Sequence, residues 1–533
     1  MTDKLTSVTI ISQGGLDSTE NHLILDSTLP GGASTLLNYE VGLYGGYRRI
    51  NGYDYLDSNF PKVDETNAEG KILCLAIYTD INGNSTVIAA RKQKSSSTYK
   101  FYYLNSSLGW IAYATGMTQN MTGSRGVEKI RNHKISIEGT SYIIFTDGVN
   151  RPIIFDGTTW SQPTGDQALD APLYCTSFMN HVFFGGDAAW PNVVYHSAPE
   201  DPLTYTAAAG AGQLIAGYRV DGLKPFREDL YVFGNQRIKK VNVDGTTFVI
   251  NDVATNIGVI APDSIIEMDG DILFLAQDGV RTVSGTNKIG DVNLGSISRQ
   301  VQQLINSFQD NYDLTFLDST VIKKKSQFRY FISNGDISDV GTGLIGGIRL
   351  VNGSPSWEFS ELLGIRTSCV ENDYINNEET TLHGDYDGSV YIQETGNSFA
   401  GTDITSVYAT PFLTCGDVLT RKLLRKINTF IRPEGALTLN ITPTIDWNNK
   451  NRIQSYSSSK STDDVLVLYD DPSKLWDDPS VIYDTIDNYP IFTTTATGTF
   501  NSLKITYSSS GADAPHTIQG FIIQFSPEGT RTL

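Results

Sequence analysis

The chain has 533 residues and a formal net charge of −19. Its 49 glycines and its bias toward Tyr, Phe, Asn, Asp, Ser and Thr predict many short strands joined by tight turns, and so an all-β protein. The acidic balance argues against a chain that grips nucleic acid, because phosphate binding needs Lys and Arg to replace condensed counterions.

The start of the chain and the lengths of its apolar runs suggest where it folds. The first residues, Met1 to Lys4, are polar and lack the charged and apolar regions of a signal peptide. No apolar run approaches the roughly 20 residues of a membrane span, so we expect no membrane span and folding in a cytosol. The cysteines form no CxxC pair, and we interpret them as small buried thiols: Cys74, Cys175, Cys369 and Cys415.

A hairpin pattern recurs through residues 66–405. An apolar strand, a tight Gly, Asn or Asp turn and a second apolar strand follow one another, as in Ile72–Tyr78, Asn82–Asn84 and Thr86–Ala90. Repeats of roughly 40 to 50 residues are typical of β-propeller blades, which bury their faces only against neighbouring blades. We therefore predict a β-propeller over 66–405.

One stretch departs from this pattern. Apolar residues at helical spacing predict a single short amphipathic helix inserted between blades. These residues are Ile297, Val301, Leu304, Ile305 and Phe308.

The composition shifts near residue 405. The strands Leu503–Tyr507 and Phe521–Phe525 alternate or run apolar, as edge and core strands of a sandwich do. We predict a C-terminal β-sandwich-like module over 406–533. Residues 1–65 are expected to be an N-terminal segment that packs with this module.

Two charged segments of the C-terminal module are candidate functional surfaces. A basic cluster on an acidic chain either meets an acidic protein neighbour or phosphates, or is a solvated strand face with snorkelling side chains. An acidic run lacks the ligand spacing of an EF-hand and is interpreted as a solvated or lumen-facing loop. The basic residues are Arg421, Lys422, Arg425, Lys426 and Arg432, and the acidic ones are Asp463, Asp464, Asp470, Asp471, Asp477 and Asp478.

No pattern predicts a catalytic, metal or cofactor site. Asp156–Trp160 resembles the Asp-box of sialidases, but its Asp and Gly are adjacent, so we interpret it as a hairpin turn with Trp160 packed over it. The six histidines contain no HExxH, and no nucleotide-binding loop or GxSxG elbow is found. We expect the protein not to be an enzyme and to carry no cofactor.

Three stretches carry a family resemblance through their order and spacing. They are Leu223–Ile238, Gly258–Val301, and Tyr408–Leu413 followed by Lys422–Ile427 and Gly520–Phe525. Together they cover about half of the chain and resemble the tail nozzle, or tail hub, proteins of short-tailed bacteriophages.

The resemblance implies a structural virion protein of the phage tail, assembled in the host cytoplasm. It implies a homohexameric ring docked on adaptor subunits below the portal, in which the module over 406–533 assembles the ring and docks the adaptor. It also implies that tail fibres or spikes are anchored to the ring and that double-stranded DNA passes through without specific binding. Two alternatives stay open: a glycan-binding or glycan-cleaving propeller of the phage tail, and a plug that stabilises the phage head.

Overall fold

The structure is a computed structural model of the 533-residue chain. It describes residues 5–42, 45–63, 70–93, 97–122, 127–165, 169–245, 247–284, 296–351, 354–448, 458–462, 466–467, 482–483 and 491–530.

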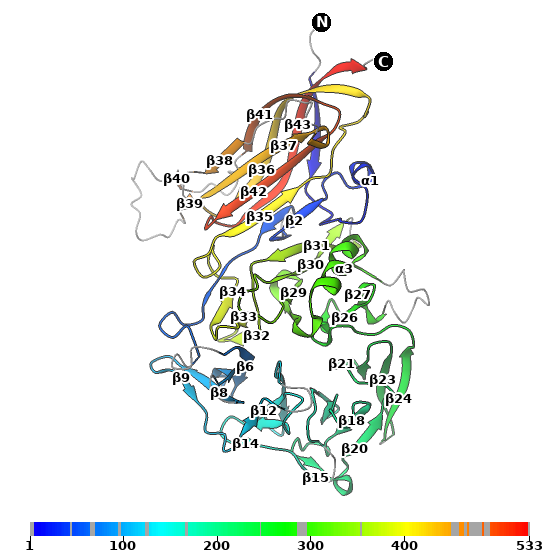
Figure 1. Ribbon diagram of the computed structural model, residues 1–533, viewed down its shortest axis with the longest axis vertical. Coiled ribbons are helices and arrows are strands. Elements are labelled where there is room, and N and C mark those ends of the chain that lie inside the picture. Colours follow the sequence, from blue (N-terminus) through cyan, green and yellow to red (C-terminus); the bar gives the residue numbers. More distant parts are fainter. Residues whose placement is uncertain are drawn as a thin grey trace.

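Strands dominate the molecule, which confirms the predicted all-β class and the β-propeller (Figure 1). The propeller forms the lower part of the view, and a β-sandwich that carries both termini stands above it. The sequence predicted one short helix, and α3 (Gln302–Asn311) is that helix, with Ile305 and Phe308 buried. A second helix, α1 (His22–Thr28), was not predicted; the Asn21 side chain caps it by accepting from the Leu23 backbone N–H.

Six blades have sheets of their own. The first blade consists of β6 (Ile72–Thr79), β7 (Ser85–Lys92), β8 (Thr98–Asn105), β9 (Gly109–Ala112) and β10 (Gln119–Asn120). The second consists of β11 (Arg131–Ile137), β12 (Thr140–Thr146), β13 (Ile153–Phe155) and β14 (Trp160–Ser161). The third consists of β16 (Tyr174–Phe178), β17 (His181–Gly185), β18 (Val193–His196) and β20 (Gly212–Ile215), next to the short pair β15 (Thr164–Gly165) and β19 (Thr204–Tyr205). The fourth consists of β21 (Gly222–Phe226), β22 (Asp229–Phe233), β23 (Ile238–Asp244) and β24 (Thr247–Ala254), and the fifth of β25 (Ile266–Met268), β26 (Asp271–Ala276) and β27 (Gly279–Thr282).

The sixth blade closes the ring with a strand from the other end of the chain. Its strands β32 (Cys369–Ile375), β33 (Glu378–Gly384) and β34 (Val390–Gln393) are completed by β5 (Tyr53–Tyr55). Tyr55 stacks on Tyr391 with ring centroids 5.0 Å apart. Part of the segment 1–65 therefore belongs to the propeller, because without β5 the outer edge of β34 would be left unpaired.

Neighbouring blades pack through apolar faces, as the repeat pattern predicts. Between the first and second blades, Phe101 lies 4.7 Å from Phe145 and 4.8 Å from Trp160 between ring centroids. Turns within the blades are closed by short polar side chains: Asp80 accepts from the backbone N–H groups of Asn82 and Asn84, each at 2.8 Å. Such Asx turns explain why Asn, Asp and Gly occur between the strands.

A nine-stranded sheet joins the propeller to the sandwich. Its first strands stand in the ring between the fifth and sixth blades, where β28 contacts both β25 and β32. In order the sheet contains β28 (Asp318–Ile322), β29 (Gln327–Ile332), β30 (Thr342–Val351), β31 (Ser354–Leu363), β2 (Thr35–Leu37), β35 (Ile404–Ala409), β42 (Leu503–Gly511), β37 (Leu437–Ile445) and β38 (Ser458–Thr462). A single sheet thus crosses the domain boundary expected at residue 405.

A six-stranded sheet forms the other layer of the sandwich. It contains β3 (Tyr39–Val41), β4 (Tyr47–Arg49), β43 (His516–Thr530), β36 (Thr420–Pro433), β41 (Ile491–Phe500) and β1 (Thr6–Ile11). A short parallel pair, β39 (Leu466–Val467) and β40 (Ile482–Tyr483), completes the described strands. N-terminal and C-terminal strands pair directly, since β1 and β4 both lie against β43.

The buried side chains of β36 change parity along the strand. Lys422 and Leu424 are buried at even positions, whereas Ile427, Thr429 and Ile431 are buried at odd ones. The register of β36 against both neighbours shifts between Leu424 and Lys426, which is a β-bulge. The bulge places two consecutive residues, Arg425 and Lys426, in exposed positions.

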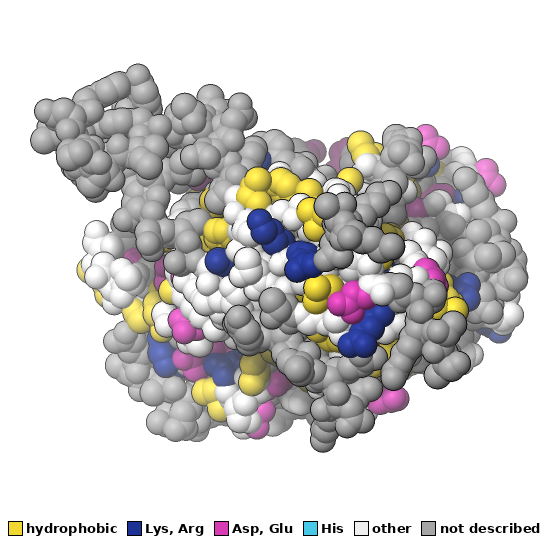
Figure 2. Space-filling view, turned by 90° about the horizontal axis from the view of Figure 1, so that it is seen from above, with side chains coloured by type: hydrophobic (Ala, Val, Ile, Leu, Met, Phe, Trp, Pro, Cys, Tyr) yellow, Lys and Arg dark blue, Asp and Glu magenta, His cyan; other side chains and the backbone are white. Residues whose placement is uncertain are grey.

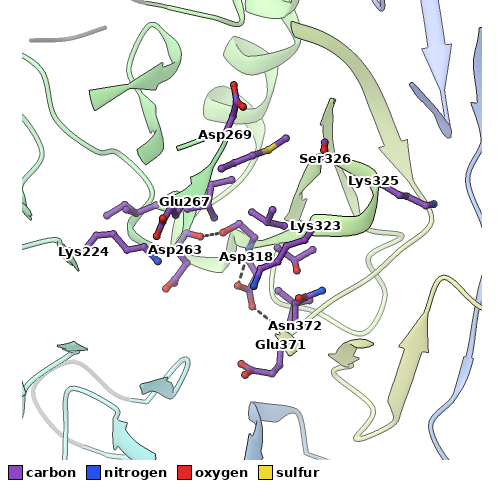
Figure 3. A pocket seen from close by; sticks show the side chains of 18 of the residues that line it. Lys224, Asp263, Glu267, Asp269, Asp318, Lys323, Lys325, Ser326, Glu371 and Asn372 are labelled. Atoms are coloured by element: carbon purple, nitrogen blue, oxygen red, sulfur yellow. Dashed lines mark hydrogen bonds between the residues drawn. The ribbon is translucent and has the colours of Figure 1, made fainter. Parts of the chain in front are cut away.

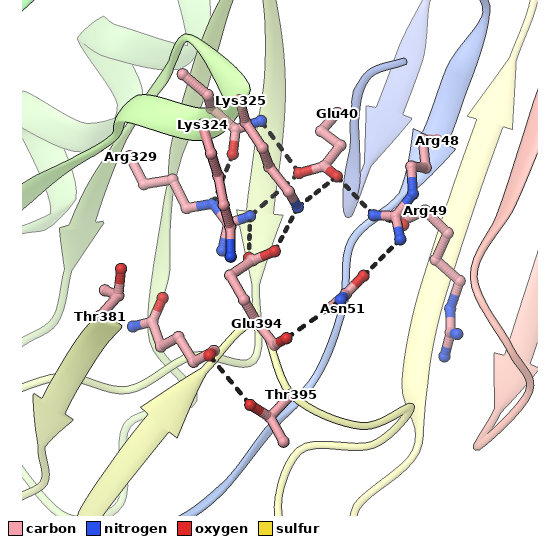
Figure 4. Close-up of polar contacts among 12 residues, drawn as sticks. Glu40, Arg48, Arg49, Asn51, Lys324, Lys325, Arg329, Thr381, Glu394 and Thr395 are labelled. Atoms are coloured by element: carbon pink, nitrogen blue, oxygen red, sulfur yellow. Dashed lines mark hydrogen bonds and ion pairs between the residues drawn. The ribbon is translucent and has the colours of Figure 1, made fainter. Parts of the chain in front are cut away.

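Buried charges hold the propeller against the sandwich (Figure 4). Glu40 of β3 is 2% exposed, and one of its oxygens lies 2.7 Å from both Arg48 Nη1 and Lys325 Nζ. Its other oxygen lies 3.1 Å from Arg329 Nη2. We call the whole set the junction cluster; its members are Glu40, Arg48, Lys325, Arg329, Glu394 and Glu434.

The junction cluster balances three acids against three bases. Glu394 lies 2.5 Å from Arg329 and also pairs with Lys325, and Arg48 lies 2.6 Å from Glu434. Burial raises the pKa of Glu394, but the charges of Arg329 and Lys325 outweigh it and bring the pKa to about 2. The desolvation of each ion is thus offset only while its partners are present.

We expect Glu40→Gln to destabilise the fold by about 3–5 kcal/mol, because it leaves buried cations without their counter-charge. Glu128→Gln removes a similar charge from a pair in which the glutamate side chain is 60% exposed, so it should cost less than about 1 kcal/mol. Chemical unfolding of both variants measures the difference. Equal losses would contradict the role given to the junction cluster.

The pKa of Glu394 also predicts how stability depends on pH. The folded pKa of about 2 lies below the ordinary value of 4.5, so its contribution is present above pH 4.5 and is lost as pH falls toward 2. The full contribution amounts to roughly 3 kcal/mol. Thermal melting of the wild type and of Glu394→Gln between pH 6 and pH 3 should show a smaller acid loss in the variant; parallel curves would contradict the prediction.

Candidate binding funnel and outer sheet face

A cavity of about 1410 Å³ occupies the centre of the propeller (Figure 3). Residues of β6, β11, β16, β21, β25, β28 and β32 line it, and Ile11, Val41 and Leu350 from the sandwich side also border it. We call this cavity the funnel. The inner strand of each blade is hydrogen-bonded to the next strand of its sheet, so the sheets hold the lining residues in place.

Ion pairs cross the funnel near the start of its inner strands. Arg131 of the second blade holds Asp263 with Nε and Nη2 at 2.8 and 2.7 Å, and Lys129 Nζ lies 3.3 Å from Asp263 and 2.9 Å from Asp318. Asp263 immediately precedes the fifth blade, and Asp318 opens β28. These contacts therefore join opposite sides of the ring.

The two aspartates differ in electrostatic environment. Burial raises the pKa of Asp263, but Arg131 and Lys129 outweigh it and lower the pKa overall. Burial raises the pKa of Asp318; Lys129 opposes the rise and Asp263 adds to it. Asp318 also accepts from the Val370 backbone N–H at 2.7 Å. Both carboxylates are engaged in holding blades together.

A second ion-pair group connects the second and sixth blades. Lys134 Nζ lies 2.6 Å from Glu371 and 2.5 Å from Asp373. Asn132 Nδ2 donates to Glu371 at 3.2 Å and to the Leu75 carbonyl at 3.0 Å. These contacts bridge over β6, the inner strand of the first blade.

Three charged side chains of the funnel lack an ion-pair partner among the described residues. Lys224 of β21, Glu267 of β25 and Lys323 line the funnel, and none of them forms an ion pair with another residue of the described part of the chain. Burial lowers the pKa of Lys224; Glu267 opposes this shift, and Lys323 adds to it. Lys224 is thus a half-buried cation without an ion-pair partner among the described residues.

The structure does not bring all the predicted basic residues together. Lys422 is 2% exposed and donates to the carbonyls of Asp417 and Thr420 at 2.5 and 2.9 Å, so it is a structural residue at one edge of the sandwich core. Arg425 and Lys426 are exposed at the bulge. Arg421, which is bonded to Thr499, and Arg432 are half-buried.

Arg425 and Lys426 lie on the outer face of the six-stranded sheet. Arg425 Nε donates to Ser526 of β43 at 3.3 Å. Viewed from the sandwich end, Lys and Arg side chains are interspersed with apolar and acidic ones (Figure 2). The predicted acidic lining, Asp463, Asp464, Asp470, Asp471, Asp477 and Asp478, lies outside the described residues.

Other sequence features have structural places. Asp156 accepts from the backbone N–H groups of Thr158 and Thr159, and Trp160 stacks on Phe155 with centroids 4.5 Å apart, as expected of a hairpin turn. All four cysteines are free thiols. In the described ranges no three His, Cys, Asp or Glu side chains gather as metal ligands, and no helix there is long and apolar enough to cross a membrane.

Sequence reasoning missed the funnel entirely. Its charged residues come from inner strands scattered from Lys129 to Glu371, and no spacing in the sequence relates one strand to the next. The one local signal is the run of three lysines, Lys323–Lys325, directly after β28. Only the closure of the ring places Lys323 opposite Lys224.

Comparison with known proteins yields distant structural likenesses. No family model matches the chain, and no curated protein matches it significantly. The crystal structure of an ancestral GH74 enzyme is similar over 68% of this chain and 50% of that one, with 8% identity and a TM-score of 0.39. The WD40 domain of Neurospora crassa Pan2 is similar over 65% of this chain and 94% of that domain, with 9% identity and a TM-score of 0.34. The chain thus spans about half the length of the GH74 enzyme.

We expect Lys129→Met to lower the free energy of unfolding by about 3–5 kcal/mol, because Asp318 then stays buried without a cation. Lys240→Met removes a cation from the more exposed pair with Asp229 and should cost at most about 1 kcal/mol. Urea unfolding of both variants measures the two losses. If Lys129→Met is no worse than Lys240→Met, the ion pairs across the funnel do not hold the blades together.

Proposed function

We propose that the chain is a structural subunit of a short-tailed phage tail, the tail nozzle or hub. In this proposal six copies form a ring on adaptor subunits below the portal, tail fibres or spikes attach to it, and double-stranded DNA passes through without specific binding. The subunit carries out no catalysis. The family resemblance of the sequence suggests this function, and features of the sandwich support it.

The observation that carries the proposal is the position of Arg425 and Lys426. Both are exposed at a β-bulge on the outer face of a sheet, in a chain with a net charge of −19. A small positive surface on an acidic subunit complements an acidic surface of its neighbour, and such pairing sets orientation and suppresses wrong partners. Head-to-tail contacts of this kind close into rings.

The rigidity of the subunit also supports a load-bearing role. The strand β5 closes the propeller, the N-terminal strands pair with β43, and the junction cluster ties the two parts together. Ion pairs cross the propeller axis at Lys129 and Arg131, so we place the proposed DNA path between subunits and not through one propeller. An acidic ring repels the duplex and does not retain it.

We expect the double variant Arg425→Glu with Lys426→Glu to block ring assembly, because it replaces attraction between subunits or to the adaptor by repulsion. The control is Lys92→Glu with Lys100→Glu, which makes the same change of charge at exposed positions of the first blade. Mass photometry of each protein mixed with the adaptor measures assembly, and circular dichroism checks folding.

The wild type and the control should form hexamers, and the Arg425 and Lys426 double variant should stay monomeric with an unchanged melting temperature. Normal hexamers of the double variant would overturn the interface. A wild-type monomer that hydrolyses a host polysaccharide would overturn the nozzle proposal in favour of a glycan-cleaving propeller.

A further inference from the structure

The funnel contains an unsatisfied positive charge. Lys129 and Arg131 of its lining each hold carboxylates within 3.3 Å. Lys224 and Lys323 form no ion pair with a described carboxylate. Lys224 is half-buried, and burial lowers its pKa, whereas Lys323 is exposed and its Nζ lies 5.5 Å from the centroid of the Tyr374 ring. A cation withdrawn from water without a counter-ion is costly, so such a group is poised to take an anion that enters from outside.

Lys323 lies at the other end of β28 from the ion pair of Lys129 with Asp318. Asp318 opens β28 and Lys323 follows its last residue, so the two positions are separated by roughly 16 Å of extended strand. Figure 3 shows Lys224 and Lys323 reaching into the cavity from different sides. We call the ion pairs of Lys129 and Arg131, which cross the cavity near the start of the inner strands, its floor. Lys224 is the third residue of β21 and Lys323 follows the end of β28, so both lie farther along the inner strands than these pairs.

Hydrogen-bonding groups accompany the lysines. Glu267 is an exposed residue of the lining, and its charge raises the pKa of Lys224. Ser326 and Asn372 also border the cavity. A carboxylate accepts hydrogen bonds from hydroxyl groups but repels a second anion, so Glu267 favours a ligand whose negative charge is confined to one end. Apolar rim residues, the exposed Ile11 and Leu350, suit the carbon face of a ring.

We propose that the funnel binds an anionic sugar, with its carboxylate or phosphate group between Lys224 and Lys323 and its hydroxyl groups donating to Glu267. Lysine acts as a point charge and accepts either anionic group, whereas a planar fork of arginine donors would select one geometry. The floor of ion pairs stops a polymer from threading through, so the sugar enters as a chain end or a free molecule. This binding is independent of ring assembly.

The test measures binding of four probes to the full chain by isothermal titration calorimetry at low salt: glucuronate, glucose 1-phosphate, inorganic phosphate and glucose. We expect glucuronate or glucose 1-phosphate to bind at least tenfold more tightly than glucose and inorganic phosphate. Whichever of the two binds better identifies the anionic group. Lys224→Met and Lys323→Gln should each weaken that binding at least tenfold, whereas Lys324→Gln, which changes the neighbouring lysine that does not line the funnel, should leave it unchanged.

Glu267→Gln separates sugar recognition from simple charge. It should weaken binding of the anionic sugar and leave or strengthen the weak binding of inorganic phosphate, because it removes both a hydroxyl acceptor and a negative charge. Melting curves establish that each variant is folded. The proposal is overturned if none of the anions binds, if inorganic phosphate binds as tightly as the sugars, or if the Lys224 and Lys323 variants bind like the wild type.

Discussion

The buried junction cluster is the constraint on which the relation between the two parts of the molecule depends. Glu40 is brought by the N-terminal segment, Arg329 by the nine-stranded sheet and Glu394 by the end of the sixth blade. Because these groups are far apart in sequence and almost fully buried, their charges are compensated only when propeller and sandwich are both formed. The cluster adds to a hydrophobic core that runs without interruption from the fifth blade through the nine-stranded sheet into the sandwich.

The N-terminal segment also connects the two parts of the molecule. Its strands β1 and β4 pair with β43, and its strand β5 completes the sixth blade. Periodicity predicted the hairpins, the helix α3 and the sandwich strands, since these follow from local apolar patterns. It could not predict β5, because three residues, Tyr53–Tyr55, carry no period of their own and are defined by their partner Tyr391.

In the candidate sites, too, some features could be predicted from the local sequence, whereas others depend on contacts between distant strands. The basic run of β36 was visible in the sequence, but the bulge at Arg425 that exposes this residue with Lys426, and the burial of Lys422, depend on pairing with two neighbouring strands. The funnel was invisible because Lys224, Glu267 and Lys323 come from three different inner strands or their ends. A single lysine in a strand such as β21 does not predict a binding site, because its neighbours in the funnel are known only from the folded propeller.

The central proposal is that acidic chains with the exposed pair Arg425 and Lys426 assemble into a closed ring. Symmetry analysis of cryo-electron microscopy images of the purified chain with its adaptor tests that proposal most directly. We expect six-fold rings with an open central bore between subunits. Particles that remain single subunits, or that close with a different symmetry, would contradict it.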